Sequence, residues 1–91
     1  MILEIDVGRT SPPHRRRSVA ELHVRADDRV EIPAEIYREK GLFRITIYSK
    51  ADGPTWDYPL GQFLSAIGRG ISILDEYYDK LREQGLLDDM D

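Results

Sequence analysis

The sequence has 91 residues and no cysteine, with 13 Lys and Arg against 17 Asp and Glu, for a formal net charge of −4 at pH 7. This length suits one domain, and the lack of cysteine excludes disulfides, thiolate zinc sites and a thiol nucleophile. The apolar runs are too short to span a bilayer, and the first residues lack the order of a signal peptide. We therefore expect a single cytoplasmic domain over residues 1–91.

Alternating apolar and polar residues predict four short strands, over residues 3–7, 20–25, 30–32 and 43–48. Residues 8–18 contain two adjacent prolines and a run of three arginines and predict a loop. Pro33 suits the first turn of a helix, so residues 34–40 predict a short helix that Gly41 ends. Residues 49–54 have the composition of a turn.

The C-terminal half contains one apolar stripe with helical spacing. Its members are Leu60, Phe63, Leu64, Ile67, Ile71, Leu74, Tyr78 and Leu81. Steps of three and four residues place them on one side of a helix from about Pro59 to Gln84, which Gly85 ends, with a bend possible near residues 68–70. The predicted fold class is α+β: a three- or four-stranded, mainly antiparallel sheet with a short helix and one long C-terminal helix packed on one face.

Acidic side chains gather in the second part of the chain. Residues 51–91 hold nine acidic and three basic side chains, a net charge of −6. Such a surface repels nucleic acid and membranes and attracts a basic protein. The predicted partner-binding residues are the helix carboxylates and two tyrosines, a residue type enriched at interface hot spots: Tyr58, Asp75, Glu76, Tyr77, Asp79 and Glu83. The alternative is a solvated acidic helix that only keeps the protein soluble.

The sequence offers few groups for catalysis. His14 lies in the predicted loop and His23 on the polar side of its strand, and neither a nucleophile elbow nor a zinc-binding histidine pair occurs. Glu35 and Glu39 fall one turn apart on the short helix, where they could form a carboxylate pair, although exposed helix surface is the simpler interpretation. We expect no enzyme, no cofactor and no metal site.

Three adjacent arginines, Arg15, Arg16 and Arg17, are the main feature that would suit nucleic acid. Arginines in a loop can pair with phosphates, and each contact adds to a salt-dependent affinity. The alternatives are a solvated loop or an internal partner for the acidic helix.

The stretch RVEIPAEIYREKGL, residues 29–42, resembles the SpoVT/AbrB-like swapped-hairpin domain, which includes MazE-type antitoxins. The resemblance implies a homodimeric, interleaved β-barrel that binds DNA through basic residues, here Arg25, Arg29 and Arg38. Together with the arginine cluster, these residues are the candidates for nucleic-acid binding.

The order of elements, strands followed by a Trp-Asp-Tyr-Pro turn and one long acidic helix, is similar to that of small bacterial immunity proteins. Those proteins are acidic inhibitors that plug a toxin domain. The leading hypothesis is a non-catalytic inhibitor of immunity, antitoxin or phage anti-defence type, whose helix occludes a basic site on a toxin or effector. The alternative is a dimeric DNA-binding regulator. A domain this small is marginally stable, so dimerisation or a tight partner would help.

Overall fold

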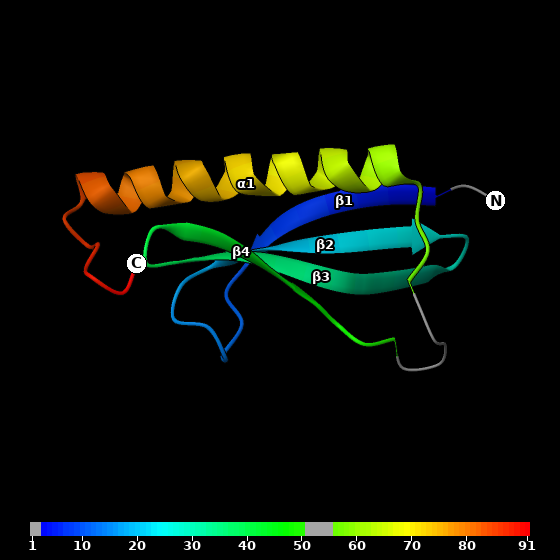
Figure 1. The fold of residues 1–91 in the computed structure, drawn as a ribbon, viewed down its shortest axis with the longest axis horizontal. Helices are drawn as coiled ribbons and strands as arrows, with labels where there is room; N and C mark the ends of the chain where they lie inside the picture. The colour runs from blue at the N-terminus through cyan, green and yellow to red at the C-terminus, as the bar shows by residue number, and fades with distance from the viewer. Residues whose placement is uncertain (1–2, 51–55) are drawn as a thin grey trace.

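The computed structural model describes residues 3–50 and 56–91, so the turn expected over residues 49–54 lies largely outside the described residues. The protein has an α+β fold, in which one helix packs against an antiparallel sheet of order β1-β2-β3-β4 (Figure 1). The elements are β1 (Leu3–Thr10), β2 (Val19–Ala26), β3 (Arg29–Glu39), β4 (Leu42–Ile47) and α1 (Leu60–Glu83). The expected sheet and long helix are confirmed.

The short helix predicted over residues 34–40 is wrong, because residues 34–39 continue β3 and Lys40 begins a turn. Ala34 pairs with Leu22 of β2 on one side and with Ile47 of β4 on the other. Pro33 lies where the register between β2 and β3 shifts, which marks a β-bulge. A bulge in a strand tolerates a residue without an N–H, so the proline enters the sheet there instead of starting a helix.

Gly41 closes a hairpin and ends no helix. Lys40 and Gly41 have φ values of +51° and +79°, and they separate the paired residues Glu39 and Leu42. Two positive φ angles between paired strands are typical of a type I′ turn, whose twist matches that of the flanking strands. The N–H groups of Lys40 and Gly41 also donate to the carbonyl oxygens of Met90 and Asp91, each at 3.1 Å. The last residues of the chain are therefore fastened to this turn.

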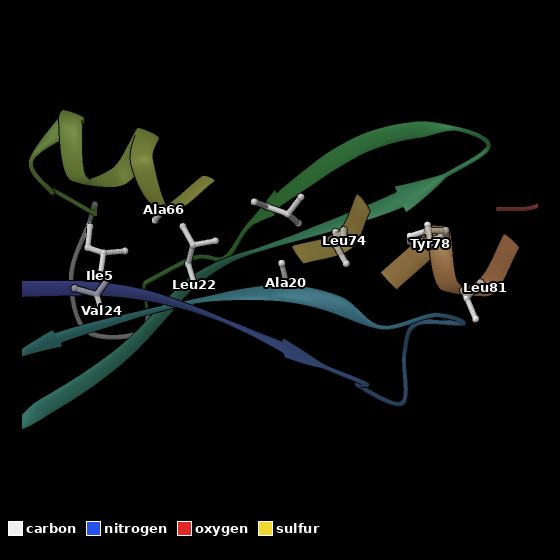
Figure 2. Close-up of a cluster of buried hydrophobic side chains, with 9 residues drawn as sticks. Ile5, Ala20, Leu22, Val24, Ala66, Leu74, Tyr78 and Leu81 are labelled. Carbon is white, nitrogen blue, oxygen red and sulfur yellow. The ribbon is translucent and has the colours of Figure 1, made fainter. Parts of the chain in front are cut away.

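The helix α1 runs through residues 68–70 without interruption. Its buried residues are Ala66, Gly70, Leu74, Tyr78 and Leu81. Of these, Ala66, Leu74, Tyr78 and Leu81 form a core with Ile5, Ala20, Leu22 and Val24 of the sheet (Figure 2). Leu60 and Leu64, two members of the predicted stripe, are 69% and 56% exposed, so the packed face lies further round the helix than the sequence indicated. Gly85, with φ +70°, ends the helix as predicted: its N–H donates to Arg82 and that of Leu86 to Leu81.

Gly70 lets the helix approach the sheet closely. A Cβ atom at this position would lie 2.8 Å from Cδ1 of Ile36 and 3.3 Å from Cβ of Ala20. Both neighbours belong to the buried core, whereas a Cβ atom at Gly68 would meet nothing within 4 Å. The helix α1 packs mainly on β1 and β2, and the close approach at Gly70 brings it to Ile36 of β3.

Replacing Gly70 by leucine should therefore lower the free energy of unfolding by about 1–3 kcal/mol, because the side chain has to displace the helix or Ile36. The same substitution at Gly68 should raise the free energy of unfolding by up to about 1 kcal/mol, since leucine favours the helix and points into solvent. Urea unfolding followed by circular dichroism measures both. Equal destabilisation by the two variants would contradict the close approach.

Candidate functional site

The four predicted carboxylates of α1 lie together on its exposed outer side: Asp75, Glu76, Asp79 and Glu83. Glu76 faces Lys80 at 3.8 Å, and Asp79 accepts a hydrogen bond from Arg82 at 2.8 Å. The other two form no ion pair with any residue that the structure describes. The helix thus presents an acidic surface to solvent, and we call these four residues the acidic face.

The two predicted tyrosines are not part of the acidic face. Tyr58 is half-buried, stacks between Trp56 and Phe63, and donates a hydrogen bond to Glu31 at 3.3 Å. Burial, followed by the charge of Glu31, raises the pKa of Tyr58, which keeps it neutral. Tyr58, which the sequence suggested as a partner-binding residue, therefore makes its contacts within the chain.

Tyr77 is also half-buried and used internally. Its ring packs edge-on against Tyr78 at 5.3 Å, and the guanidinium of Arg9 lies 4.7 Å from the ring centroid. The N–H of Ser18 donates to its hydroxyl at 3.4 Å. The tyrosine joins α1 to the start of β2 and is not a free anchor.

Arg16 and Arg17 bind the end of the chain. Arg17 donates from Nε and from its terminal nitrogen to the Asp91 carboxylate at 2.9 Å, and to the carbonyl of Leu86 at 2.6 Å. Arg16 bonds Asp91 at 2.7 Å and also contacts Asp88. The hydrogen bond from Arg17, against the opposing effect of burial, holds the pKa of Asp91 well below its usual range. Of the alternatives considered from the sequence, an internal acidic partner is the one observed. The partners are Asp88 and Asp91, which come after α1 in the chain and are not part of the helix.

Arg15 binds a buried carboxylate on the side of the sheet away from α1. Its Nε donates to Glu35 at 2.7 Å and its terminal nitrogen to Thr46 at 3.1 Å. Its guanidinium lies 3.7 Å above the centroid of the Tyr37 ring, and His14 lies 3.1 Å from the same Glu35 oxygen. The side chain of Glu35 is only 1% exposed, so the expectation of an exposed helix glutamate there is wrong.

Glu35 stays ionised in this environment. Burial alone would raise its pKa, but the interactions with His14, Arg15 and Tyr48 outweigh it and lower the pKa. Conversely, burial and the neighbouring carboxylate raise the pKa of Tyr48 to about 12. A carboxylate that is already neutralised by an arginine and covered by its loop is a structural group, since a general base needs access to a substrate proton. Glu39, its expected companion, is exposed at the end of β3.

The remaining candidate arginines lie at opposite ends of β3. Arg29 and Arg25 flank the turn between β2 and β3, with Arg25 opposite Val30. Arg38 lies near the other end, with its guanidinium 4.7 Å from the Tyr78 ring centroid. At about 3.3 Å per residue, Arg29 and Arg38 are separated by roughly 30 Å. The six candidate arginines therefore do not form one continuous basic surface.

Comparison with protein-family models found no match, and neither did comparison with curated proteins or with solved structures. Within residues 3–50 and 56–91, no helix is both long and apolar enough to cross a membrane. No group of three potential metal ligands occurs in the described part of the chain.

Replacing Glu35 by alanine should lower the free energy of unfolding by about 2–3 kcal/mol, because Arg15 then keeps a partly buried charge without its partner. Glu39→Ala is the matched control on the same strand and should change stability by less than about 0.5 kcal/mol. Chemical denaturation at neutral pH measures the difference. Two equally mild variants would show that the Glu35–Arg15 pair carries little of the stability.

Acid should destabilise the protein through the same groups. The folded-state pKa values of Glu35 and Asp91 lie below their usual values of 4.5 and 3.8. Their stabilisation is therefore complete above the usual values, and it is lost progressively as the pH falls from there through the lower folded-state values. Urea unfolding from about pH 7 to about pH 3 should show this loss, and Glu35→Gln should reduce it. An unchanged pH dependence in that variant would contradict the lowered pKa.

Proposed function

We propose that this protein is a non-catalytic inhibitor of another protein, of immunity or antitoxin type, that acts in the cytoplasm by covering a basic site with the acidic face of α1. The observation that carries the proposal is the exposure of the four carboxylates on one side of one helix. Complementary charge steers association and selects a basic partner. The predicted residues Tyr58 and Tyr77 lie outside the acidic face and make contacts within the chain.

The rigidity of the helix supports this use. On the opposite side of the same turns, Leu74 and Tyr78 are fully buried and Leu81 is 8% exposed. The helix lies along one side of the sheet (Figure 1), and these buried side chains hold the acidic face in one orientation. A preorganised surface loses less entropy on binding than a flexible tail of the same charge.

The spacing of the acidic face also favours a cationic partner. Asp75 and Asp79, and likewise Asp79 and Glu83, are like charges one turn apart, and each such pair destabilises a helix by about 0.2–0.5 kcal/mol. Arg82 offsets this only at Asp79. A basic site would relieve the repulsion between all three carboxylates on binding.

The arginines support the same interpretation from the other side. Arg15, Arg16 and Arg17 are neutralised by Glu35, Asp88 and Asp91 within the chain. Their charge is therefore less available to phosphates, whereas that of the acidic face stays available to a partner. Binding of DNA, the alternative function, would rest on Arg25 and Arg29, which are exposed at one end of the sheet.

The test is charge reversal of the acidic face. The wild-type protein, immobilised and exposed to lysate from its native host, should capture a basic protein, whose affinity is then measured by calorimetry at low and high salt. The variant Asp75→Lys, Asp79→Lys, Glu83→Lys should weaken that affinity by about 100-fold, because each attraction becomes a repulsion.

The matched control reverses three exposed carboxylates elsewhere, Glu4, Asp28 and Asp89, so that the net charge changes equally. It should bind the captured protein about as well as the wild type. If both triple variants bind equally, the acidic face is not the binding surface. If nucleic acid is captured and Arg25→Ala with Arg29→Ala abolishes that capture, the DNA-binding alternative replaces the proposal.

A further inference from the structure

The strand β4 is an open edge with an apolar surface. It is last in the sheet order, and no strand pairs with its outer side in the described part of the chain. Phe43, Ile45 and Ile47 are 37%, 41% and 61% exposed. Ile36, the neighbour of Ile45 on β3, touches the site of Gly70 on α1, so these three side chains lie on the helix side of the sheet.

The backbone of the same three residues also faces outward. Glu39 and Leu42 flank a two-residue turn, and such a flanking pair exchanges both of its hydrogen bonds. Alternation along β4 then directs the N–H and C=O groups of residues 43, 45 and 47 away from β3. The bond from the Tyr48 N–H to the Pro33 carbonyl at 2.8 Å agrees with this alternation.

The two edges of the sheet are protected differently. The outer strand β1 carries exposed charges at Glu4, Asp6 and Arg9, which discourage pairing with another strand. In β4 the one charge is Arg44, on the face opposite α1, where it donates to the hydroxyl of Tyr37 at 3.2 Å. Neither a proline nor a charge on the helix side blocks this edge.

We propose that two copies of this chain pair through β4, antiparallel about a twofold axis at Ile45, to form one eight-stranded sheet. The apolar side chains of both copies lie on the same face of the joined sheet only if the register places one residue opposite its own copy. Centring on Ile45 sets Phe43 opposite Ile47 and Arg44 opposite Thr46. The pairing closes about six backbone hydrogen bonds.

The neighbouring registers are less favourable. Centring on Arg44 would place two arginines opposite each other, which is destabilising. Centring on Thr46 would set Phe43 opposite Ser49, beyond the end of β4, and remove its apolar neighbour. The register at Ile45 is therefore the one in which every apolar side chain of the edge meets another.

A hollow beside β4 fits the second copy in the same register. It has a volume of about 410 Å³ and is lined by Pro33, Ile47, Trp56, Tyr58, Leu60 and Phe63. Because Phe43 of the second copy lies opposite Ile47, its ring reaches this apolar hollow. The twofold axis makes the contact reciprocal, so both rings and both hollows are used at once. A foreign strand need not carry an aromatic residue at the position that faces the hollow, whereas a second copy always does. A second copy is therefore the occupant we assign.

Cysteine cross-linking tests the register directly, because the natural chain has no cysteine. Opposed residues in a hydrogen-bonded pair lie about 5.5 Å apart at Cα, within reach of a disulfide. Ile45→Cys should form a covalent dimer on oxidation, and Phe43→Cys should cross-link when mixed with Ile47→Cys. Asp75→Cys, on the outer side of α1, should not. Comparable cross-linking at Asp75 and Ile45 would overturn the proposal.

Sedimentation supplies an independent readout. The wild type should have twice the mass of its 10.5 kDa chain, and Ile45→Lys should be a folded monomer by circular dichroism. Val30→Lys is the matched control: Val30 is 62% exposed on β3, outside the proposed interface, and its variant should stay dimeric. A monomeric wild type would refute the pairing, even if its β4 pairs with a strand of another protein. A dimer that survives Ile45→Lys would also refute it.

Discussion

A single helix has to cover a four-stranded sheet in this protein, and it is too narrow to do so. A helix is about 10 Å across and strands are about 4.8 Å apart, so one helix covers about two strands. The helix packs mainly on β1 and β2 and reaches β3 at Ile36, which lies close to Gly70. The apolar side of β4 is left outside the core as a direct consequence, with Ile45 and Ile47 exposed.

The other face of the sheet is closed by charge instead of by a second helix. The segment between β1 and β2 brings Arg15 onto the buried carboxylate of Glu35, and the following arginines hold Asp91. Removing two charges from water is expensive, and the pairing offsets that cost only while both partners are present. Here the pairs define where the loop and the last residues of the chain lie, and they give the three arginines acidic partners within the chain. Because these pairs use equal numbers of positive and negative charges, the remaining side chains still carry the formal net charge of −4.

Much of the fold could be predicted from local pattern, and the failures have a common cause. The long helix has eight apolar residues at regular spacing and a glycine at its end, a signal that no tertiary contact reverses. Residues 34–39 are too few to distinguish a period of two from a helical turn, and Pro33 favoured the wrong choice. The burial of Glu35 depends on Arg15, twenty residues earlier in the chain, which periodicity does not register. The acidic face was predictable because it needs only its own helix.

The two proposed surfaces are compatible because they lie at different places on the fold. Pairing through β4 about a twofold axis perpendicular to the sheet leaves both copies of α1 on the same side, each over its own β1 and β2. The acidic faces then point outward from one assembly, and neither is covered by the pairing. Two identical faces on a rigid frame can engage a partner that is itself dimeric, and the second contact then forms at a high effective concentration. Because one helix is too narrow to cover β4, this edge is free to pair with a second copy, and the resulting dimer presents two acidic faces to a partner.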